Sequence, residues 1–264
     1  MACVQMVLAG PLFVSAMDIP VYVISLARAL ERRANISGRL RDAKVQYEIV
    51  DAVDGKTLAL EKLGNRLQND LAYKRYQHRL TKNEIGCFLS HYNLWERMLS
   101  ERTPCALILE DDACWKPGFF DVVAALPKCG WHWDYVLLSG GEARRVESEL
   151  CDLPHGHRLV RHHRPGWTTA AYLLTLAGAE KAHRQCYKIN GHVDGTMRQY
   201  WRNGLAFYEV TPSPAYQSDE PSQIGYAHRT PLSPAEKRRR SRMRNYRGFR
   251  RKLYHLLHKP SMRK

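Results

Sequence analysis

The stretch from Cys105 to Ala113 is Cys-Ala-Leu-Ile-Leu-Glu-Asp-Asp-Ala. Its apolar residues 106–109 predict a short strand buried on both faces, and three carboxylates, residues 110–112, follow at the carboxyl end of that strand. Adjacent carboxylates repel one another, and a bound divalent cation turns that repulsion into attraction. Because ligands of open α/β sheets bind outside the carboxyl ends of the strands, this position favours a binding site.

The alternation of side chains along an extended chain predicts that Glu110 and Asp112 face the ligand, whereas Asp111 points to the other side. Hard oxygen ligands favour Mg²⁺ or Mn²⁺ over zinc, and such a cation keeps positions for water and phosphate oxygens. The alternative for an acidic triplet is a solvated turn that opens the next helix.

The residues near the start of the chain predict a βαβ unit. Residues 21–26 are rich in β-formers, residues 28–43 carry apolar side chains near helical spacing, and residues 45–50 predict a second strand. The default for two such strands is a right-handed parallel crossover. Asp51 follows the second strand and is a candidate for binding the base or ribose of a nucleotide, whereas an Asp-Gly turn explains Asp54.

The strongest helix signal lies at residues 81–100. Thr81 and Glu84 have the spacing of a capping box, and an apolar stripe runs along the segment that follows. Ser90 and His91 lie off this stripe. A histidine in such a position is more often a surface or helix-packing residue than a functional one.

The remainder of the chain alternates further strands and helices, which predicts an α/β fold. The predicted elements are helices at 58–63, 119–126, 177–187 and 196–202, and strands at 133–138, 158–160, 166–175 and 205–210. Residues 64–79, 143–157 and 211–234 have the composition of loops.

The composition is typical of a soluble globular protein, with 44% hydrophobic and 25% charged residues in a chain of 264. Seven cysteines without a Cys-x-x-Cys pair indicate reduced thiols of a cytosolic protein rather than a disulfide framework or a zinc site. No apolar run reaches the roughly 18 to 20 residues of a membrane span. Residues 1–17 make a poor signal peptide, so we expect an N-terminal extension before the domain or a misassigned start, with Met17 beginning the domain.

The net charge of +15 is concentrated in the C-terminal tail, where residues 237–264 contain 4 lysines, 9 arginines and no acid. Apolar residues between Tyr246 and Leu257 give this tail an amphipathic helical pattern. Such a helix suits an anionic membrane surface, where each basic residue adds on the order of 1 kcal/mol. A solvated tail is the alternative. Nucleic acid is not an expected partner, because the aromatic residues form no recognisable nucleic-acid motif.

Several stretches together resemble glycosyltransferase family 25, the lipopolysaccharide-type glycosyltransferases. They are Val23–Leu26 with Glu31–Arg33, residues 50–55, residues 80–91 with Trp95, residues 106–113, Ala171–Leu174 with residues 178–181, Val193–Asp194, and residues 214–217 with Ser222. These pieces occur in order over about residues 20–225. Asn83 departs from the pattern, which more often has glycine there, and both ends of the chain fall outside it.

The resemblance implies an α/β enzyme of the GT-A type, with a Rossmann-like, mostly parallel central sheet flanked by helices. Residues 18–235 would form this domain, followed by the basic membrane-associating tail 236–264. Family members with this pattern transfer hexose, commonly galactose from UDP-galactose, to core sugars of lipooligosaccharide with inversion at the anomeric carbon. The implied partners are a nucleotide sugar and a glycolipid acceptor, in the cytoplasm at the inner face of the membrane.

The resemblance also implies roles for single residues. The acidic triplet would be the metal motif, with Mn²⁺ or Mg²⁺ held by Asp112 and Glu110 and a third contact from His192 or Gln217. The candidates for donor binding are Ser25, Leu26, Arg33, Asp51, Ser90, His91, Glu110, Asp111 and Gln217. Inversion in one displacement needs a carboxylate base for the acceptor hydroxyl. Asp194 is the candidate base, with helix capping as its alternative role, and Glu142 is the reserve candidate.

A rival hypothesis is a catalytically silent protein that docks on nucleic acid or an anionic membrane through the basic tail. This hypothesis does not explain the acidic triplet or the Ser90–His91 pair. Steeply salt-dependent retention on nucleic acid would favour it.

Overall fold

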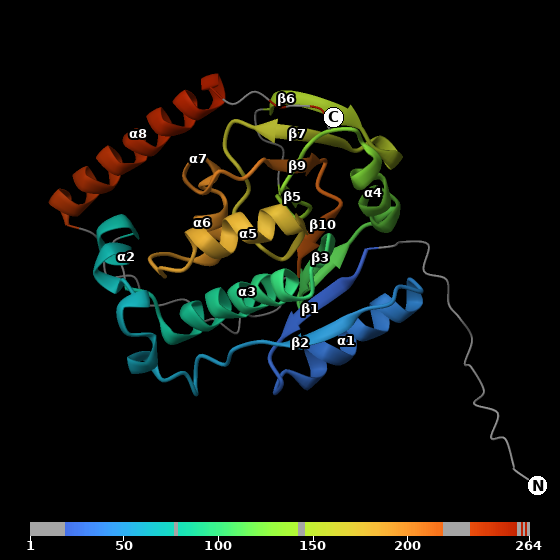
Figure 1. The fold of residues 1–264 in the computed structure, drawn as a ribbon, viewed down its shortest axis with the longest axis horizontal. Coiled ribbons are helices and arrows are strands. Elements are labelled where there is room, and N and C mark those ends of the chain that lie inside the picture. Colours follow the sequence, from blue (N-terminus) through green and yellow to red (C-terminus); the bar gives the residue numbers. More distant parts are fainter. Residues whose placement is uncertain are drawn as a thin grey trace, which may run out of the picture.

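The computed structural model describes residues 19–76, 79–141, 146–218 and 233–257, together with Pro260 and Met262. Eight strands form one central sheet with helices on both faces (Figure 1). In order across the sheet, the strands are β2 (Glu48–Asp51), β1 (Val21–Ser25), β3 (Cys105–Glu110), β8 (Ala171–Thr175), β5 (Tyr135–Leu137), β9 (Phe207–Thr211), β7 (Arg158–His162) and β6 (Val146–Asp152).

The first βαβ unit has the predicted parallel pairing. Helix α1 (Leu30–Asp42) connects β1 to β2, and Ser25 is paired with Asp51 across these strands. Strand β1 also pairs in parallel with β3, with Ile24 opposite Glu110. The carboxyl ends of β2, β1 and β3 therefore meet at one edge of the sheet, as predicted for the acidic residues.

The rest of the sheet is mixed. Strand β8 runs antiparallel to both β3 and β5, β5 and β9 are parallel, and β7 and β6 are antiparallel to their neighbours. A separate antiparallel pair, β4 (Ala113–Trp115) and β10 (Ala215–Gln217), brings Gln217 opposite Ala113. This small pair places Gln217 beside the acidic triplet.

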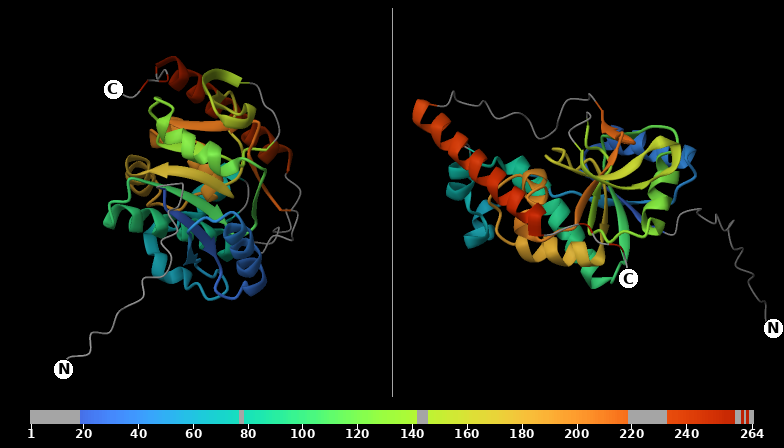
Figure 2. Two further views of the ribbon diagram at one scale, coloured as in Figure 1. Left: turned by 90° about the vertical axis from the view of Figure 1, so that its right-hand side faces the viewer. Right: turned by 90° about the horizontal axis from the view of Figure 1, so that it is seen from above.

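Successive side chains of β3 point to opposite faces of the sheet and pack in two hydrophobic cores. Ala106 and Ile108 belong to the core under α3, whereas Leu107 and Leu109 belong to the core under α1 and α4. By the same alternation, Glu110 falls on the α3 side. The two helical layers on either side of the sheet are visible in Figure 2. The remaining main helices are α3 (Lys82–Ser100), α4 (Phe119–Ala125), α5 (Leu176–Gln185), α6 (Val193–Met197) and α7 (Tyr200–Asn203).

Helix α3 begins with the predicted capping box. The Thr81 hydroxyl accepts from the Glu84 amide at 3.2 Å, and the Glu84 carboxylate accepts from the Thr81 amide at 2.7 Å. Ser90 and His91 are buried, with 4% and 0% of their surface exposed. The expectation that they lie off the buried side is wrong, because α3 packs against the sheet and also against α5.

Three segments with loop composition contain regular structure. Helix α2 (Asn69–Tyr76) buries only Ala72, so no apolar period marks it. Strand β6 is an edge strand that pairs only with β7 and carries polar residues. Strand β10 has only three residues. Short 3₁₀ helices complete the described elements: η1 (Leu60–Arg66), η2 (Leu126–Lys128) and η3 (Pro154–Gly156).

Two predicted elements have different bounds. The strand predicted at 166–175 starts only at Ala171, and the helix predicted at 196–202 is divided into α6 and α7. The proposed N-terminal extension, residues 1–17, lies outside the described residues.

The basic segment folds as α8 (Pro234–Leu257), which lies against α2 and α7 (Figure 1). Arg247 lies over the ring of Tyr76 at 5.2 Å, and Arg251 lies over Trp201 at 5.9 Å. One face of α8 is thereby fixed to the domain. Among the described helices, none has the length and apolar composition needed to cross a membrane.

Candidate functional site

A cleft lies at the sheet edge where β1, β2 and β3 end. It holds about 660 Å³ of space, part of it open to solvent. The residues of the predicted site that line it are Ser25, Leu26, Ser90, His91, Glu110, Asp111, Asp112 and Gln217. The structure therefore gathers most of the predicted donor-binding residues around one cleft.

Glu110 is held between α3 and the loop before β8. Its Oε1 accepts a hydrogen bond from Thr169 Oγ1 at 2.6 Å and lies 3.2 Å from Nε2 of His91. Nδ1 of His91 lies 2.9 Å from the hydroxyl of Tyr172. Burial raises the pKa of Glu110, but His91, Thr169 and Arg32 outweigh burial and hold that pKa below its ordinary value. Glu110 is therefore ionised at neutral pH.

The two aspartates share one guanidinium. Asp111 accepts from Ser25 Oγ at 2.6 Å and from Arg32 Nη1 at 2.9 Å. The same nitrogen lies 3.4 Å from Oδ2 of Asp112, which also accepts from Gln217 Nε2 at 2.9 Å. Arg32 thus offsets much of the repulsion between the carboxylates. The prediction that Asp111 points away from the site is wrong, because β3 ends at residue 110 and its alternation goes no further.

The second oxygen of Asp112 is the clearest sign of a missing partner. Oδ1 of Asp112 is buried, and it has no hydrogen bond within the described part of the chain. Burial, and after it the charge of Glu110, raises the pKa of Asp112 to about 6. An unsatisfied buried acceptor costs about 1–3 kcal/mol, and a cation would satisfy this oxygen. The oxygens of Asp112 and Glu110 therefore fit Mn²⁺ or Mg²⁺.

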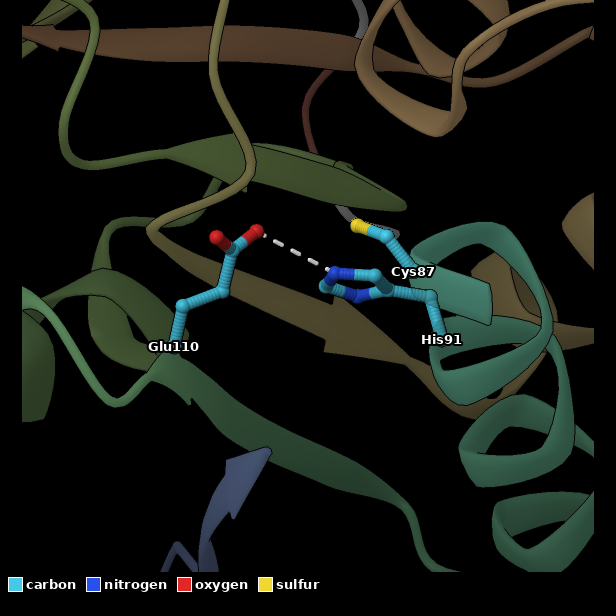
Figure 3. A group of neighbouring side chains, drawn as sticks. All are labelled: Cys87, His91 and Glu110. Atoms are coloured by element: carbon cyan, nitrogen blue, oxygen red, sulfur yellow. Dashed lines mark hydrogen bonds and ion pairs between the residues drawn. The ribbon is translucent and has the colours of Figure 1, made fainter. Parts of the chain in front are cut away.

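A second set of possible ligands lies beside the acidic triplet (Figure 3). Cys87, His91 and Glu110 each offer one ligand atom, and these atoms lie within 4.8 Å of one another. Sulfur, nitrogen and oxygen together suit zinc better than Mn²⁺. Burial, and then the nearby carboxylates, raise the pKa of the Cys87 thiol well above its ordinary value. Cys87 was not predicted, although its spacing of four residues from His91 places both on one side of a helix.

Two arginines of the cleft were also not predicted. Arg28 and Arg32 follow β1 and lie four residues apart, and both line the cleft. Arg28 forms an ion pair with Asp54 at 2.6 Å. Asp54 also accepts from the Lys56 amide at 2.9 Å, which is the turn expected from the sequence. Basic residues directly after a strand of the acidic edge were the available sequence signal.

Arg33 and Asp51 support the cleft without lining it. Arg33 donates to the backbone oxygens of Leu26 at 3.0 Å and Ser25 at 2.7 Å. It also pairs at 2.5 Å with Asp51, whose side chain is 73% exposed. These contacts fix the carboxyl end of β1 to α1, so the structure gives both residues a positioning contact.

Ser90 anchors the loop that follows β2. Its hydroxyl accepts from the Val53 amide at 2.8 Å and donates to the Gly86 oxygen at 2.7 Å. A Cβ atom on Gly86 would lie 2.6 Å from the backbone oxygen of Val53, so glycine is needed for this close approach. Helix α3 thereby sets one wall of the cleft.

Asp194 lies in the first turn of α6 and does not line the cleft. Its Oδ1 accepts from the Gly195 amide at 2.5 Å. Burial raises the pKa of Asp194 to about 6. The charge of Glu110 adds to this, whereas Arg198 and His91 oppose it. Asp194 is therefore within electrostatic range of the acidic site and of Arg198.

The other two predicted residues are not placed with the triplet. Nδ1 of His192 lies 3.4 Å from Glu84, and the imidazole packs edge-on against Tyr76, 5.5 Å between ring centroids. His192 is not among the residues that line the cleft. Glu142 lies outside the described residues.

Comparison with known proteins gives related sequences. The inactive glycosyltransferase 25 family member 3 of Mus musculus is 36% identical over 168 residues, which cover 61% of this chain and 28% of the mouse protein. Procollagen galactosyltransferase 1 of Danio rerio is 30% identical over 171 residues, which cover 62% and 28%. A glycosyltransferase 25 family member of Anopheles gambiae is 34% identical over 172 residues, with the same coverage.

The matched region is less than a third of the length of these relatives. One of them is named inactive and another a galactosyltransferase, so similarity alone does not decide activity. Residues 18–197, more than half of the chain and including the acidic triplet, match the family model described as glycosyltransferase family 25 (LPS biosynthesis protein). The chain therefore belongs to glycosyltransferase family 25.

Proposed function

We propose that the protein is a metal-dependent, inverting glycosyltransferase of the GT-A type that moves a hexose from a nucleotide sugar to an acceptor sugar. The observation that carries this proposal is the buried, unpartnered Oδ1 of Asp112, beside ionised Glu110 at the carboxyl edge of the sheet.

The donor we propose is UDP-galactose, with Ile24, Leu26 and Val53 offering an apolar wall to its nucleoside. Arg28 and Arg32 line the same cleft and would face its diphosphate. Galactose is supported by the name of the Danio rerio relative. The acceptor we propose is a core sugar of a lipooligosaccharide or lipopolysaccharide, in line with the description of the family model.

Glu110 and Asp112 would hold the cation, Mn²⁺ or Mg²⁺. When bound, such a cation stabilises the negative charge that develops on a leaving diphosphate. Arg32 would release part of its hold on the aspartates and would bind phosphate instead. Ser25 and Gln217 would keep the carboxylates oriented through their hydrogen bonds.

Asp194 is the proposed base. The acceptor hydroxyl oxygen attacks the anomeric carbon, its proton passes to the Asp194 carboxylate, and the bond between that carbon and the diphosphate oxygen breaks to release UDP. A carboxyl with a pKa of about 6 is well suited to this role near neutral pH, because it is ionised and still sufficiently basic.

We further propose that α8 binds an anionic membrane at the cytoplasmic face, where a glycolipid acceptor would lie. The side of α8 away from the domain exposes apolar residues at spacings of three and four, interspersed with basic residues. These apolar residues are Tyr246, Phe249, Leu253, Leu256 and Leu257. Apolar and basic side chains together are the requirement for such binding.

The decisive experiment is a panel of nucleotide sugars tested for metal-dependent hydrolysis, because water replaces the unknown acceptor. We expect hydrolysis of a UDP-hexose with Mn²⁺, its loss with a chelator, and its loss in Asp112→Asn. Full activity of Asp112→Asn in the presence of chelator would contradict the metal-dependent mechanism. If no nucleotide sugar binds or is hydrolysed, the silent docking protein is the better hypothesis.

A further inference from the structure

Trp167 lies in the loop between β7 and β8 and is 55% exposed. A single exposed aromatic residue is common on protein surfaces and requires no ligand. Its setting, however, distinguishes Trp167 from an ordinary surface residue.

The loop on both sides of Trp167 is held by two carboxylates. The Gly166 amide donates to both oxygens of Glu209 at 3.1 and 3.2 Å. Two residues after the tryptophan, Thr169 donates to Glu110 of the acidic site at 2.6 Å. The indole therefore stands on a rigid loop, and Thr169 of this loop is hydrogen-bonded to Glu110, a proposed metal ligand.

Arg198 covers one face of the indole. The guanidinium carbon of Arg198 lies 4.3 Å from the ring centroid of Trp167, and Arg198 is anchored by donating to the Pro165 oxygen at 2.8 Å. The exposed area therefore belongs to the opposite face and the ring edge. A cation on one face makes the ring a poor site for a second cation, but it leaves the ring flat, rigid and apolar.

The strand order separates Trp167 from the donor cleft. Strands β1 and β2, whose ends form that cleft, lie on one side of β3, whereas β8 lies on the other side. Trp167 lies in the loop four residues before β8 begins at Ala171. A Cβ atom on Gly195 would lie 3.6 Å from Cζ2 of Trp167, so the indole reaches α6 next to Asp194. Trp167 and α6 therefore lie on the β8 side of the acidic residues, whereas the donor cleft that these residues line extends to their β1 side.

We propose that Trp167 is the platform of the acceptor subsite, where a neutral pyranose ring stacks on its open face with a hydroxyl near Asp194. This inference rests on the proposed function and adds where and how the acceptor binds. The C–H groups on a pyranose face are apolar and match an aromatic ring, whereas the ring edge carries hydroxyls for the reaction. Because the loop that carries Trp167 is already fixed, binding of the acceptor costs little conformational entropy of the protein.

The test separates transfer from hydrolysis. Transfer is measured with UDP-hexose and Mn²⁺, and the acceptors are methyl glycosides of galactose, glucose, mannose and N-acetylglucosamine. Saturation-transfer NMR measures the binding of these glycosides to the protein. We expect Trp167→Ala to raise the acceptor KM at least tenfold and to remove the NMR contact, with donor hydrolysis within twofold of wild type. Trp167→Tyr should restore most of the acceptor binding, because it keeps an aromatic face.

Tyr187→Ala is the matched control, because Tyr187 is 47% exposed and Arg66 likewise lies over its ring, at 4.7 Å. It should change neither KM nor hydrolysis. Unchanged acceptor KM and NMR contact in Trp167→Ala would overturn the inference, as would the absence of glycoside binding to a wild-type protein that hydrolyses the donor. Glycoside binding that depends on Trp167, in a protein that hydrolyses no donor, would instead support the platform and contradict the proposed enzyme.

Discussion

Nε2 of His91 lies 3.2 Å from Oε1 of Glu110, and this contact joins the middle of α3 to the carboxyl end of β3. We predict that His91→Ala destabilises the protein by about 3 kcal/mol, because it leaves a buried carboxylate with one partner fewer. The pKa of Glu110 should rise for the same reason. The free energy of unfolding, measured with urea at neutral pH, tests the first statement.

A glutamine at position 91 keeps a hydrogen-bond donor, so His91→Gln should recover part of the lost stability. His155→Ala is the control, because the side chains of His155 and of its carboxylate partner Asp121 are 49% and 67% exposed. Equal free energies of unfolding for His91→Ala and His155→Ala would show that the His91 contact contributes nothing to stability.

The two sets of proposed metal ligands, which share Glu110, can be distinguished by two substitutions. We predict that Asp112→Asn raises the Kd for Mn²⁺ at least tenfold, because Oδ1 is the unsatisfied oxygen. Cys87→Ser should raise the Kd for Zn²⁺ and leave the Kd for Mn²⁺ unchanged, because a thiolate favours the softer ion. Titration calorimetry on the folded variants measures both constants.

Asp121→Asn serves as the control for charge, because the Asp121 side chain is 67% exposed on α4. It should alter neither constant. If Cys87→Ser weakened Mn²⁺ as much as Asp112→Asn, the two sets would form one mixed site, and the assignment of Mn²⁺ to carboxylates alone would be wrong.

The sequence was sufficient to predict the helices and strands that have a regular hydrophobic period or a helix-capping motif. The capping box at Thr81 and the strand before Glu110 were predicted because local spacing determines them. Helix α2 and strand β6 were missed because each packs on only one side and needs few apolar residues. The burial of His91 depends on β8 and β3, which bring Tyr172 and Glu110 to α3 from far along the chain and are not visible in local periodicity.

For the candidate site, too, the features set by local sequence were predictable and those set by tertiary packing were not. The acidic triplet and its position at the sheet edge were predictable, because the carboxyl ends of parallel strands meet at the same edge of a sheet. The sharing of Arg32 by Asp111 and Asp112 was not, because it depends on where β3 stops and on the packing of α1. Cys87 shows a third case, in which the helical spacing to His91 was present but a cysteine without a Cys-x-x-Cys partner was assumed to be packing.

Asp194 gives a prediction that couples pH to stability. Its pKa is raised from 3.8 to about 6 by burial, so the folded state binds its proton more tightly than the unfolded state. Relative to a neutral side chain, the wild type therefore loses stability as pH rises from about 4 to 6, by about 3 kcal/mol in total. Asp194→Asn should be more stable than wild type at pH 7, with the difference vanishing near pH 4.

The same substitution should abolish sugar transfer while donor affinity stays within twofold, because a base acts on the acceptor. Urea unfolding at several pH values and equilibrium binding of UDP-hexose provide the two measurements. A collapse of donor affinity in Asp194→Asn would contradict its role as base. A stability difference independent of pH would contradict the burial of its charge.

The outer side of α8 gives the last prediction. Leu256 is 73% exposed and Phe249 is 64% exposed on this side. We expect the double variant Phe249→Ser with Leu256→Ser to bind vesicles of phosphatidylglycerol at least tenfold more weakly, because each buried apolar side chain contributes about 1.5–3 kcal/mol. Vesicle sedimentation measures the binding.

Leu30→Ser is a matched control on α1, because Leu30 is also 73% exposed, and it should bind vesicles like wild type. Neutral phosphatidylcholine vesicles should bind all variants weakly, and added salt should weaken binding to the anionic ones, because the basic residues of α8 supply part of the attraction. Equal binding of wild type to neutral and anionic vesicles would contradict the role of these charges. Unchanged binding of the double variant would show that α8 does not insert its apolar side, and the membrane proposal would then lose its structural basis.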